Sequence, residues 1–447
     1  MATESAEMPI DARPTKQFFV QTLVKDVVLS EAVFDIIDNS IDGYIRAGMR
    51  DHRSVSVTVA ADRFRVEDNC GGIPKGDMES FVLRFGGRPP KPRVNARTIG
   101  AFGIGLKRSL FKLGQHILLE SDDGTREYAV LIDKAWMSRD DDWRLPFKKD
   151  GPSKGKVYTR VTVKDLYSDV ARQFSTREFE NGLAKHARMT YTAFLDTRIN
   201  LSINDVPVRP LDFRFLYDKK RHFQPMRKLV SYDGVDVVIM AGHTDYGQDP
   251  DKLCGWYVFC NDRLVVAGDT SAKTGWGGLS EMNYHYPQDA YFLGLVFLGC
   301  DDPSKLPWDT AKTGVQTDSA VYRSAQVEMQ AATARFVRTC RDAWSLKSRE
   351  TGETIGRALF ADAAGVSFRE VAVDASGEVP VVDGVLVEDK EVPLPEVANV
   401  LYVVPLDYAR RIKRKLGDAH MSHKEMGLRT LHYYAKLHGI SREQSHA

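Results

Sequence analysis

The sequence contains few cysteines, almost no net charge and no long apolar run. Its five cysteines are scattered and no pair has zinc-ligand spacing, which argues against a disulfide-stapled or zinc-finger scaffold. A net charge of +1 excludes a uniformly basic nucleic-acid binder, so such binding would need a local patch. No segment approaches the roughly 20 apolar residues of a membrane span. We therefore expect a cytoplasmic chain with reduced thiols and no membrane partner.

The 447 residues, 43% of them hydrophobic, suffice for two or three domains that each have a core. Alternating apolar patterns and helical periodicities predict an α+β protein. Up to about residue 215, helices are expected on a mixed, mostly antiparallel sheet; an α/β unit and a small C-terminal α+β region follow. The expected helices of the first part are 31–47 (with Ser30 as cap), 105–113 and 176–195, and its expected strands are 54–60, 64–68, 116–120, 127–132 and 156–164.

One predicted helix carries a polar stripe, because Glu31, Asp35, Asn39 and Asp42 recur at about one-turn intervals. A solvated face is the ordinary explanation of such a stripe. Apolar residues flank this one on both sides, which favours a cleft. The amide oxygen of Asn39 suits Mg²⁺, and a carboxylate one turn away can deprotonate a water molecule.

Two glycine-rich turns follow this helix. Asp68 ends a strand just before Gly71-Gly72; its carboxylate can accept a hydrogen bond from an exocyclic amine, although a plain β-turn explains the same residues. The second turn opens a helix whose free N–H groups form an anion site, with a surface loop as the alternative. The preceding breaker-rich stretch, 86–99, suits a lid. The candidate phosphate contacts are Gly100, Ala101, Phe102, Gly103, Ile104, Gly105, Leu106 and Lys107.

Together these three segments resemble the GHKL ATPases: gyrase, the ninety-kilodalton heat-shock chaperones, MutL mismatch-repair proteins and the ATP domain of histidine kinases. The resemblance implies that Asn39 binds Mg²⁺, that Asp35 (or Glu31) is the general base and that Asp68 recognises the adenine amine. Two residues depart from the family pattern. Asp35 stands where hydrolysing members usually have Glu, which predicts slow hydrolysis, and Cys70 replaces a glycine. The remaining implied ATP contacts are Asp42, Gly72, Ile73 and Thr159.

The resemblance continues into the second half of the chain. A strand ending in Asn261-x-Arg263 is similar to the transducer domain of MutL and microrchidia proteins, and the loop around Lys312 is similar to their loop that carries a lysine to the γ-phosphate. A surface lysine in such a loop is ordinarily solvated, and Lys273 is the second choice. The implied parts are a flexible N-terminus (1–14), a GHKL ATP-binding domain (15–220), a transducer-like domain (221–347) and a C-terminal domain of unknown role (348–447).

The last hundred residues resemble no family. Basic residues cluster on a predicted helix around 410–415, and a second helix, about 423–438, carries an apolar stripe. A packed helical pair with a solvated basic face is favoured over contact with DNA phosphates. The stripe consists of Leu428, Leu431, Tyr434 and Leu437.

The sequence therefore predicts a Mg²⁺-dependent ATPase that converts ATP and water into ADP and phosphate. By analogy with the family, ATP would close the lid, drive domain rearrangement or homodimerisation, and act on a macromolecular partner such as DNA in repair or defence. One alternative is a nucleotide-gated binding module with little turnover. Another is a chaperone-like clamp.

Overall fold

The computed structural model divides the chain into two compact units, Met1–Asp389 and Lys390–Ala447. The expected flexible N-terminus, most of the expected lid and Phe102 lie outside the described residues. The structure describes residues 15–18, 22, 24–87, 96–101, 103–139, 142–217, 224–244, 254–276, 291–345, 364–373, 380–382, 385–386, 406–418 and 421–438.

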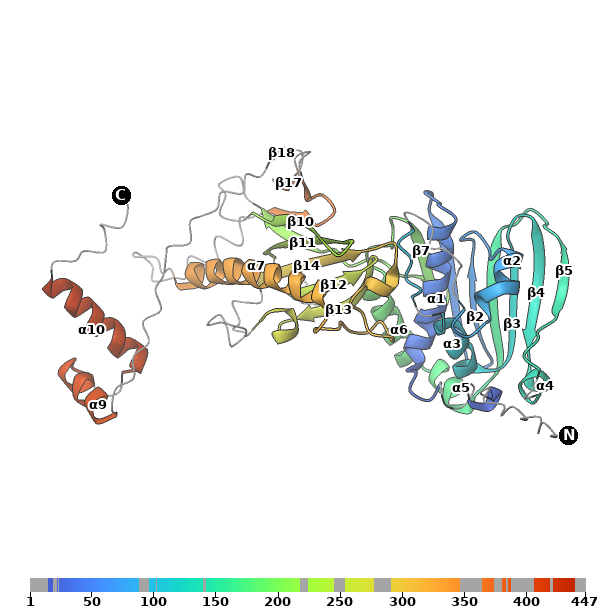
Figure 1. The fold of residues 1–447 in the computed structure, drawn as a ribbon, viewed down its shortest axis with the longest axis horizontal. Coiled ribbons are helices and arrows are strands. Elements are labelled where there is room, and N and C mark those ends of the chain that lie inside the picture. Colours follow the sequence, from blue (N-terminus) through green and yellow to red (C-terminus); the bar gives the residue numbers. More distant parts are fainter. Residues whose placement is uncertain are drawn as a thin grey trace, which may run out of the picture. The chain divides into compact units, whose positions relative to one another are not determined.

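An eight-stranded sheet forms the base of the first domain, in the order β5-β4-β3-β6-β2-β1-β7-β8 (Figure 1). Its neighbours pair antiparallel, apart from the parallel pair β1 and β7. The predicted mixed, mostly antiparallel sheet is thus confirmed. The strands are β1 (Arg53–Ala60), β2 (Arg63–Asp68), β3 (Gly114–Asp122), β4 (Arg126–Ile132), β5 (Phe147–Pro152), β6 (Tyr158–Leu166), β7 (Ile199–Ile203) and β8 (Val206–Pro207).

Helices α1 (Leu29–Arg46), α3 (Gly105–Leu113) and α5 (Ser168–Phe174) pack against this sheet. α3 has the predicted bounds. The expected Ser30 cap is wrong, because α1 already begins at Leu29 and its N-cap residue makes no side-chain bond. The predicted helix 176–195 is shorter: α6 (Arg177–Thr190) is capped by Thr176 and follows the unpredicted α5. Short helices α2 (Lys75–Asp77), η2 (Met78–Val82) and α4 (Lys134–Met137) complete this domain.

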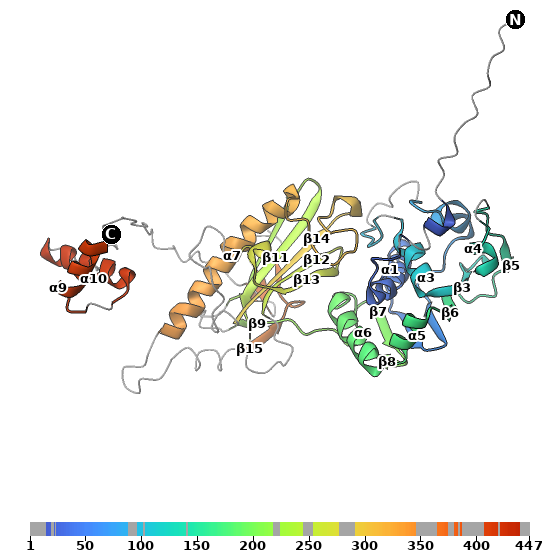
Figure 2. The same cartoon turned by 90° about the horizontal axis from the view of Figure 1, so that it is seen from below.

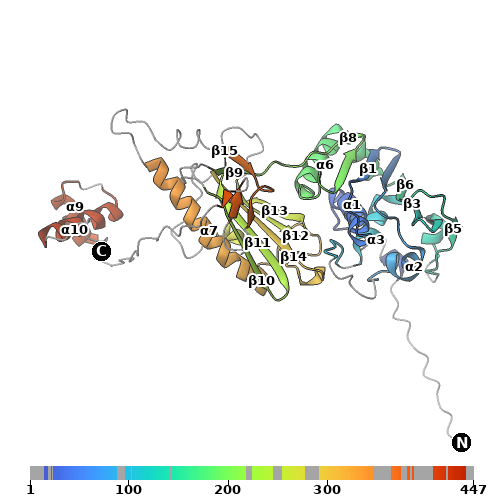
Figure 3. The ribbon, with the colours of Figure 1, turned by 90° about the horizontal axis from the view of Figure 1, so that it is seen from above.

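A five-stranded sheet forms the second domain, in the order β10-β11-β14-β12-β13. The long helix α7 (Ala320–Ser345) lies along one face (Figure 2). Strands β9 (Arg214–Tyr217) and β15 (Ala364–Ser367) pair with each other (Figure 3) and cover part of the other face, where Phe213 and Phe215 are buried. The sheet strands are β10 (Met226–Tyr232), β11 (Val235–His243), β12 (Gly255–Cys260), β13 (Arg263–Asp269) and β14 (Phe292–Gly299).

The remaining elements of the larger unit are short. Two 3₁₀ helices, η3 (Ala272–Thr274) and η5 (Pro303–Lys305), lie in loops of the second domain. Strands β16 (Ala372–Val373), β17 (Pro380–Val382) and β18 (Val385–Leu386) form a small separate sheet. Since β15 pairs with β9, residues after 348 contribute to the same compact unit as the sheets.

The smaller unit contains the two predicted helices, α9 (Leu406–Lys415) and α10 (His423–Leu437). They meet through buried Ala409, Met421 and Met426. The apolar stripe of α10 does not make this contact, since its described side chains, Leu431, Tyr434 and Leu437, are exposed. Among the described helices of the whole chain, none combines the length and apolar character needed to cross a membrane.

Candidate functional site

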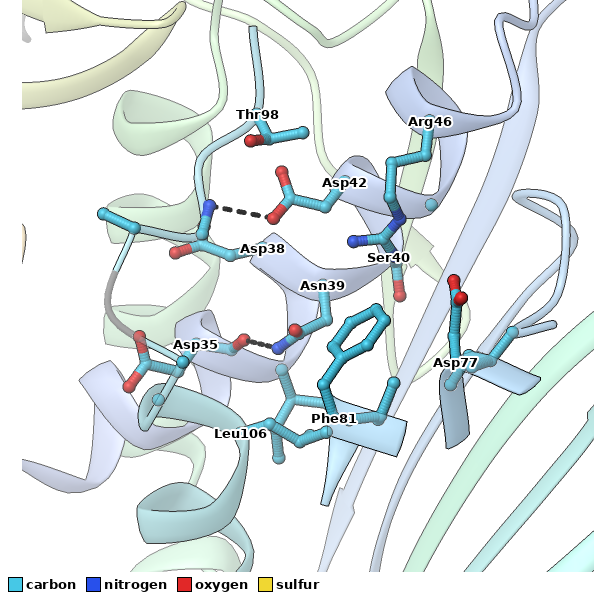
Figure 4. A pocket seen from close by; sticks show the side chains of 18 of the residues that line it. Asp35, Asp38, Asn39, Ser40, Asp42, Arg46, Asp77, Phe81, Thr98 and Leu106 are labelled. Carbon is cyan, nitrogen blue, oxygen red and sulfur yellow. Dashed lines mark hydrogen bonds between the residues drawn. The ribbon is translucent and has the colours of Figure 1, made fainter. Parts of the chain in front are cut away.

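A pocket of about 720 Å³ is enclosed by α1, the turn after β2 and the start of α3 (Figure 4). Asp35, Asn39 and Asp42 lie on α1 beside it, with Asp77 and Phe81 also at its wall. The three sequence motifs therefore meet at one pocket, although β1 and β2 separate the first from the second along the chain, and α2 and η2 separate the second from the third. Of the predicted site residues that the structure describes, all line this pocket except Glu31 and the second-choice Lys273. Those that do are Asp35, Asn39, Asp42, Asp68, Gly72, Ile73, Gly100, Ala101, Gly103, Ile104, Gly105, Leu106, Lys107, Thr159 and Lys312.

Asp42 anchors the glycine-rich segment to α1. Its buried carboxylate accepts hydrogen bonds from the backbone N–H groups of Ile99 (2.6 Å) and Gly100 (2.8 Å). A Cβ atom on Gly100 would lie 2.7 Å from Asp42 Oδ2, so a larger residue there would displace this carboxylate. Burial raises the pKa of Asp42, against the opposing effects of Arg46 and the Ile99 N–H group.

Asp68 is a buried acceptor where β2 ends. The hydroxyl of Ser40 donates to its Oδ2 (2.6 Å) and the N–H of Cys70 to its Oδ1 (2.9 Å). Burial raises the pKa of Asp68 to about 6. Thr159 lies directly opposite Asp68 on neighbouring β6. These two polar residues lie in a wall of the pocket that is otherwise apolar at Val66, Leu119 and Val161.

The turn after Asp68 explains why cysteine is tolerated at position 70. The left-handed conformations fall on Gly71 (φ 108°) and Gly72 (φ 68°), while Cys70 is buried next to α1. Gly72 therefore keeps its place in the family pattern, while the glycine that Cys70 replaces has a counterpart one position later, at Gly71.

Gly72 makes the closest backbone approach in this turn. A Cβ atom there would lie 2.3 Å from the carbonyl oxygen of Asp122. We expect Gly72→Ala to lower the free energy of unfolding by about 1–3 kcal/mol, because both the steric contact and the positive φ oppose alanine. Urea denaturation measures this loss. Gly76→Ala is the control, since its Cβ would have no neighbour within 4 Å; equal losses in the two variants would contradict the argument.

The N-terminus of α3 forms the opposite side of the pocket. Gly103 (φ 65°) precedes the helix, and the first-turn N–H groups of residues 105–107 have no partner within the helix ladder. The Lys107 ammonium group donates to the carbonyl of Val82 (3.1 Å), and burial lowers its pKa to about 8. An N-terminus beside a lysine favours an anionic ligand.

Asp35 is a residue of α1 whose side chain contacts α3. Its Oδ2 accepts hydrogen bonds from the guanidinium of Arg108 (3.2 Å) and the hydroxyl of Ser109 (3.1 Å), and Lys312 Nζ is 3.5 Å from its Oδ1. The side-chain amide of Asn39 donates to the backbone carbonyl of Asp35. That bond orients the amide nitrogen toward the helix, so the amide oxygen is the atom available to a cation.

A buried ion network joins the two domains at Asp38. This residue is not among the site residues predicted from the sequence. The carboxylate of Asp38 accepts from Lys312 Nζ (2.7 Å), Arg263 Nε (3.0 Å) and the Tyr191 hydroxyl (2.9 Å). Arg263 also donates to the carbonyl of Lys312 (2.6 Å). Burial acts to raise the pKa of Asp38, but Arg263 and Lys312 outweigh it, and the pKa is lowered. Its position between Asp35 and Asp42 on one helical stripe was the available signal.

Glu31 lies on the same helix but outside the pocket. Its Oε2 is 3.7 Å from Arg263 Nη2, and its Oε1 is 3.8 Å from His186 Nδ1. Burial raises the pKa of Glu31 to about 7. Lys273, the second choice for the γ-phosphate contact, lies in η3, where Tyr322 donates to its carbonyl (2.9 Å), and it does not line the pocket.

Comparison with known families gives one match within the first domain. Residues 27–162 match the model of the family "Histidine kinase-, DNA gyrase B-, and HSP90-like ATPase". This stretch begins just before α1 and ends in β6, so it contains all three motifs. None of the curated proteins compared matches the chain. The match supports placing this domain in the GHKL superfamily and suggests ATP binding; closeness to MutL or microrchidia proteins stays a prediction.

Proposed function

We propose that the protein binds Mg·ATP in the pocket between α1 and α3 and hydrolyses it slowly. The observation that carries the proposal is the meeting of Asp68, Asn39 and the N-terminus of α3 around one cavity. A family match over most of the residues that line this cavity adds to it. Lid closure, homodimerisation and action on DNA extend the proposal by family analogy alone.

The adenine end of the ligand would lie at Asp68 and Thr159. A buried carboxylate held by Ser40 and Cys70 offers a fixed acceptor for an exocyclic amine. A purine that presents a carbonyl in place of this amine would set one acceptor against another, and the missing hydrogen bond would cost about 1–3 kcal/mol. The site thus favours adenine over guanine.

The phosphates would lie at the N-terminus of α3. Backbone N–H groups after Gly103 and the ammonium group of Lys107 supply donors and positive charge there. The donor set also fits Mg²⁺, a hard cation that keeps several waters and takes few protein ligands beside phosphate oxygens. Asn39 would hold it through the amide oxygen, and bound Mg²⁺ would neutralise charge developing on the phosphates.

Hydrolysis would use Asp35 as the base that orients or deprotonates the attacking water. Asp35 is one methylene shorter than glutamate, which favours a low rate. Lys312 would contact the γ-phosphate, since it enters the pocket from the second domain and lies 3.5 Å from Asp35. ATP binding would thereby be sensed by both domains.

The direct test is the variant Asn39→Ala. We expect it to lose Mg·ATP binding by at least about tenfold, because removing the amide removes the cation's protein ligand. Isothermal titration with a non-hydrolysable ATP analogue and Mg²⁺ measures this. The matched control is Asn69→Ala, whose side chain accepts from the Ser54 N–H and does not line the pocket. Unchanged affinity of Asn39→Ala would remove the proposed site.

The second candidate is a nucleotide-gated binding module with little turnover. The bonding of Asp35 favours it, since Arg108, Ser109 and Lys312 already contact both oxygens of the carboxylate, which leaves few lone pairs to orient a water molecule. In that case ATP would act as a ligand that shifts the conformation. Single-turnover hydrolysis distinguishes the two functions.

A further inference from the structure

A second pocket, of about 280 Å³, lies on the five-stranded sheet of the second domain. Arg227 and Met240 are register partners on β10 and β11, and Val238 pairs with Phe297 on β14. Met240 belongs to the face that contacts Phe213 and Phe215. The pocket therefore occupies the part of this face that β9 and β15 leave uncovered, opposite the face that α7 covers.

Arg227 is a half-buried cation that no described carboxylate neutralises. Its Nη1 donates to the carbonyl of Val371 (2.9 Å), while its buried Nε makes no hydrogen bond. Within the part of the chain that the structure describes, no carboxylate forms an ion pair with it, and burial lowers its pKa. A desolvated guanidinium with an unused donor is costly unless an anion completes it.

The other charged side chains of the pocket do not supply an anion for Arg227. Asp236 pairs with Arg97, and Asp262 pairs with Arg198 at 2.8 Å. A further guanidinium, that of Arg369, donates to the carbonyls of Thr192 (2.9 Å) and Leu195 (3.3 Å), and among the described residues it too has no carboxylate partner. The two carboxylates are thus neutralised locally, and two cations remain for a ligand.

One wall of the pocket is aromatic and flat. The rings of Phe297 and Phe368 are parallel within 9°, with centroids 6.0 Å apart, and Phe259 stacks on Phe297 at 4.4 Å. Both Phe297 and Phe368 are partly exposed at the pocket. Parallel rings favour a planar apolar group by offset stacking, while the guanidiniums favour a phosphate or carboxylate.

The geometry points to a second ligand site: we propose that this pocket binds a small anion attached to a planar ring, and that its occupancy changes the affinity of the first pocket for ATP.

The segment 97–100 connects the two pockets. Arg97 lines the second pocket and Thr98 the first, and Asn261 of the second pocket donates to the Thr98 carbonyl (2.7 Å). Ile99 and Gly100, the next residues, bind Asp42.

The experiment uses the full chain and phenyl phosphate as the probe, with phenol and inorganic phosphate as partial probes. Ligand-observed NMR, recorded with the first pocket saturated by a non-hydrolysable ATP analogue, reports binding to the second. We expect Arg227→Gln to weaken phenyl phosphate by about tenfold and Arg369→Gln, an exposed position that leaves folding intact, to weaken it less. The matched control is Lys228→Gln, the next residue of β10, which pairs with Glu328 of α7 on the other face.

Equal affinity in wild type, Arg227→Gln and Arg369→Gln would overturn the site, as would binding of phenol as tight as that of phenyl phosphate. The coupling rests on the proposed ATP binding and is measured separately, as a change of about fivefold in ATP affinity when phenyl phosphate is present. An unchanged ATP affinity with bound probe would overturn the coupling. Failure of ATP to bind at all would refute the proposed function, while the arginine variants would still decide the second site.

Discussion

The Asp35→Asn protein is expected to hydrolyse ATP about 10²–10⁴-fold more slowly than wild type in a single turnover, the usual contribution of a general base. Mg·ATP binding should persist, because asparagine keeps the size of the side chain and the acceptor for Arg108 and Ser109. A quenched-flow measurement with enzyme in excess over ATP gives the chemical rate without product release.

Glu31→Gln is the matched comparison, because Glu31 shares the helix and the acidic character of Asp35 but contacts Arg263 outside the pocket. Its single-turnover rate should stay close to that of wild type. A loss of the single-turnover rate that occurs only in Glu31→Gln would identify Glu31 as the base. A wild type without measurable turnover, but with intact ATP binding, would establish the nucleotide-gated module instead.

Asp38→Ala is expected to lower the free energy of unfolding of the larger unit by about 3–5 kcal/mol. Arg263 and Lys312 are each less than a tenth exposed, and Asp38 is their nearest carboxylate. Stability falls because the substitution leaves these two buried cations without that partner. Urea denaturation followed by tryptophan fluorescence measures it. Asp62→Ala is the control, as its pair with Arg63 is exposed and such pairs contribute at most about 1 kcal/mol.

A double-mutant cycle separates the ion network from simple loss of a side chain. Combining Asp38→Ala with Lys312→Met removes one of the stranded cations, so the double variant should be more stable than the sum of the single losses predicts. Strict additivity would show that Asp38 and Lys312 do not interact in solution. An Asp38→Ala protein as stable as Asp62→Ala would contradict the whole network.

Local residue types account for several elements of the fold. The turns at Asn204-Asp205 and Asn261-Asp262 have positive φ at both positions, which these residue types tolerate and which hairpins require. Helix α3 follows its glycine-rich entry at the expected residue. The polar strand β5 was missed because it pairs at a sheet edge, where only its backbone needs a partner.

Site residues were predictable where their spacing in the sequence marks one face of a helix. They were not predictable where contacts with distant parts of the chain give a residue its role. Asp35, Asn39 and Asp42 are readable from helical spacing, and all three line the pocket. Asp38 follows the same spacing, but its importance comes from Arg263 and Lys312, which reach it only once the domains have folded together. Glu31 also follows this spacing, but it lies outside the pocket, with its Oε2 3.7 Å from Arg263 Nη2.

The buried cluster at Asp38 also constrains how this chain can change through recombination. Its carboxylate lies 225 positions before Arg263 and 274 positions before Lys312. A crossover that exchanged the first domain for one with a neutral residue at this position would leave Arg263 and Lys312 of the second domain buried without this carboxylate. Asp38, Arg263 and Lys312 must therefore be inherited as a set, although two domains encode them.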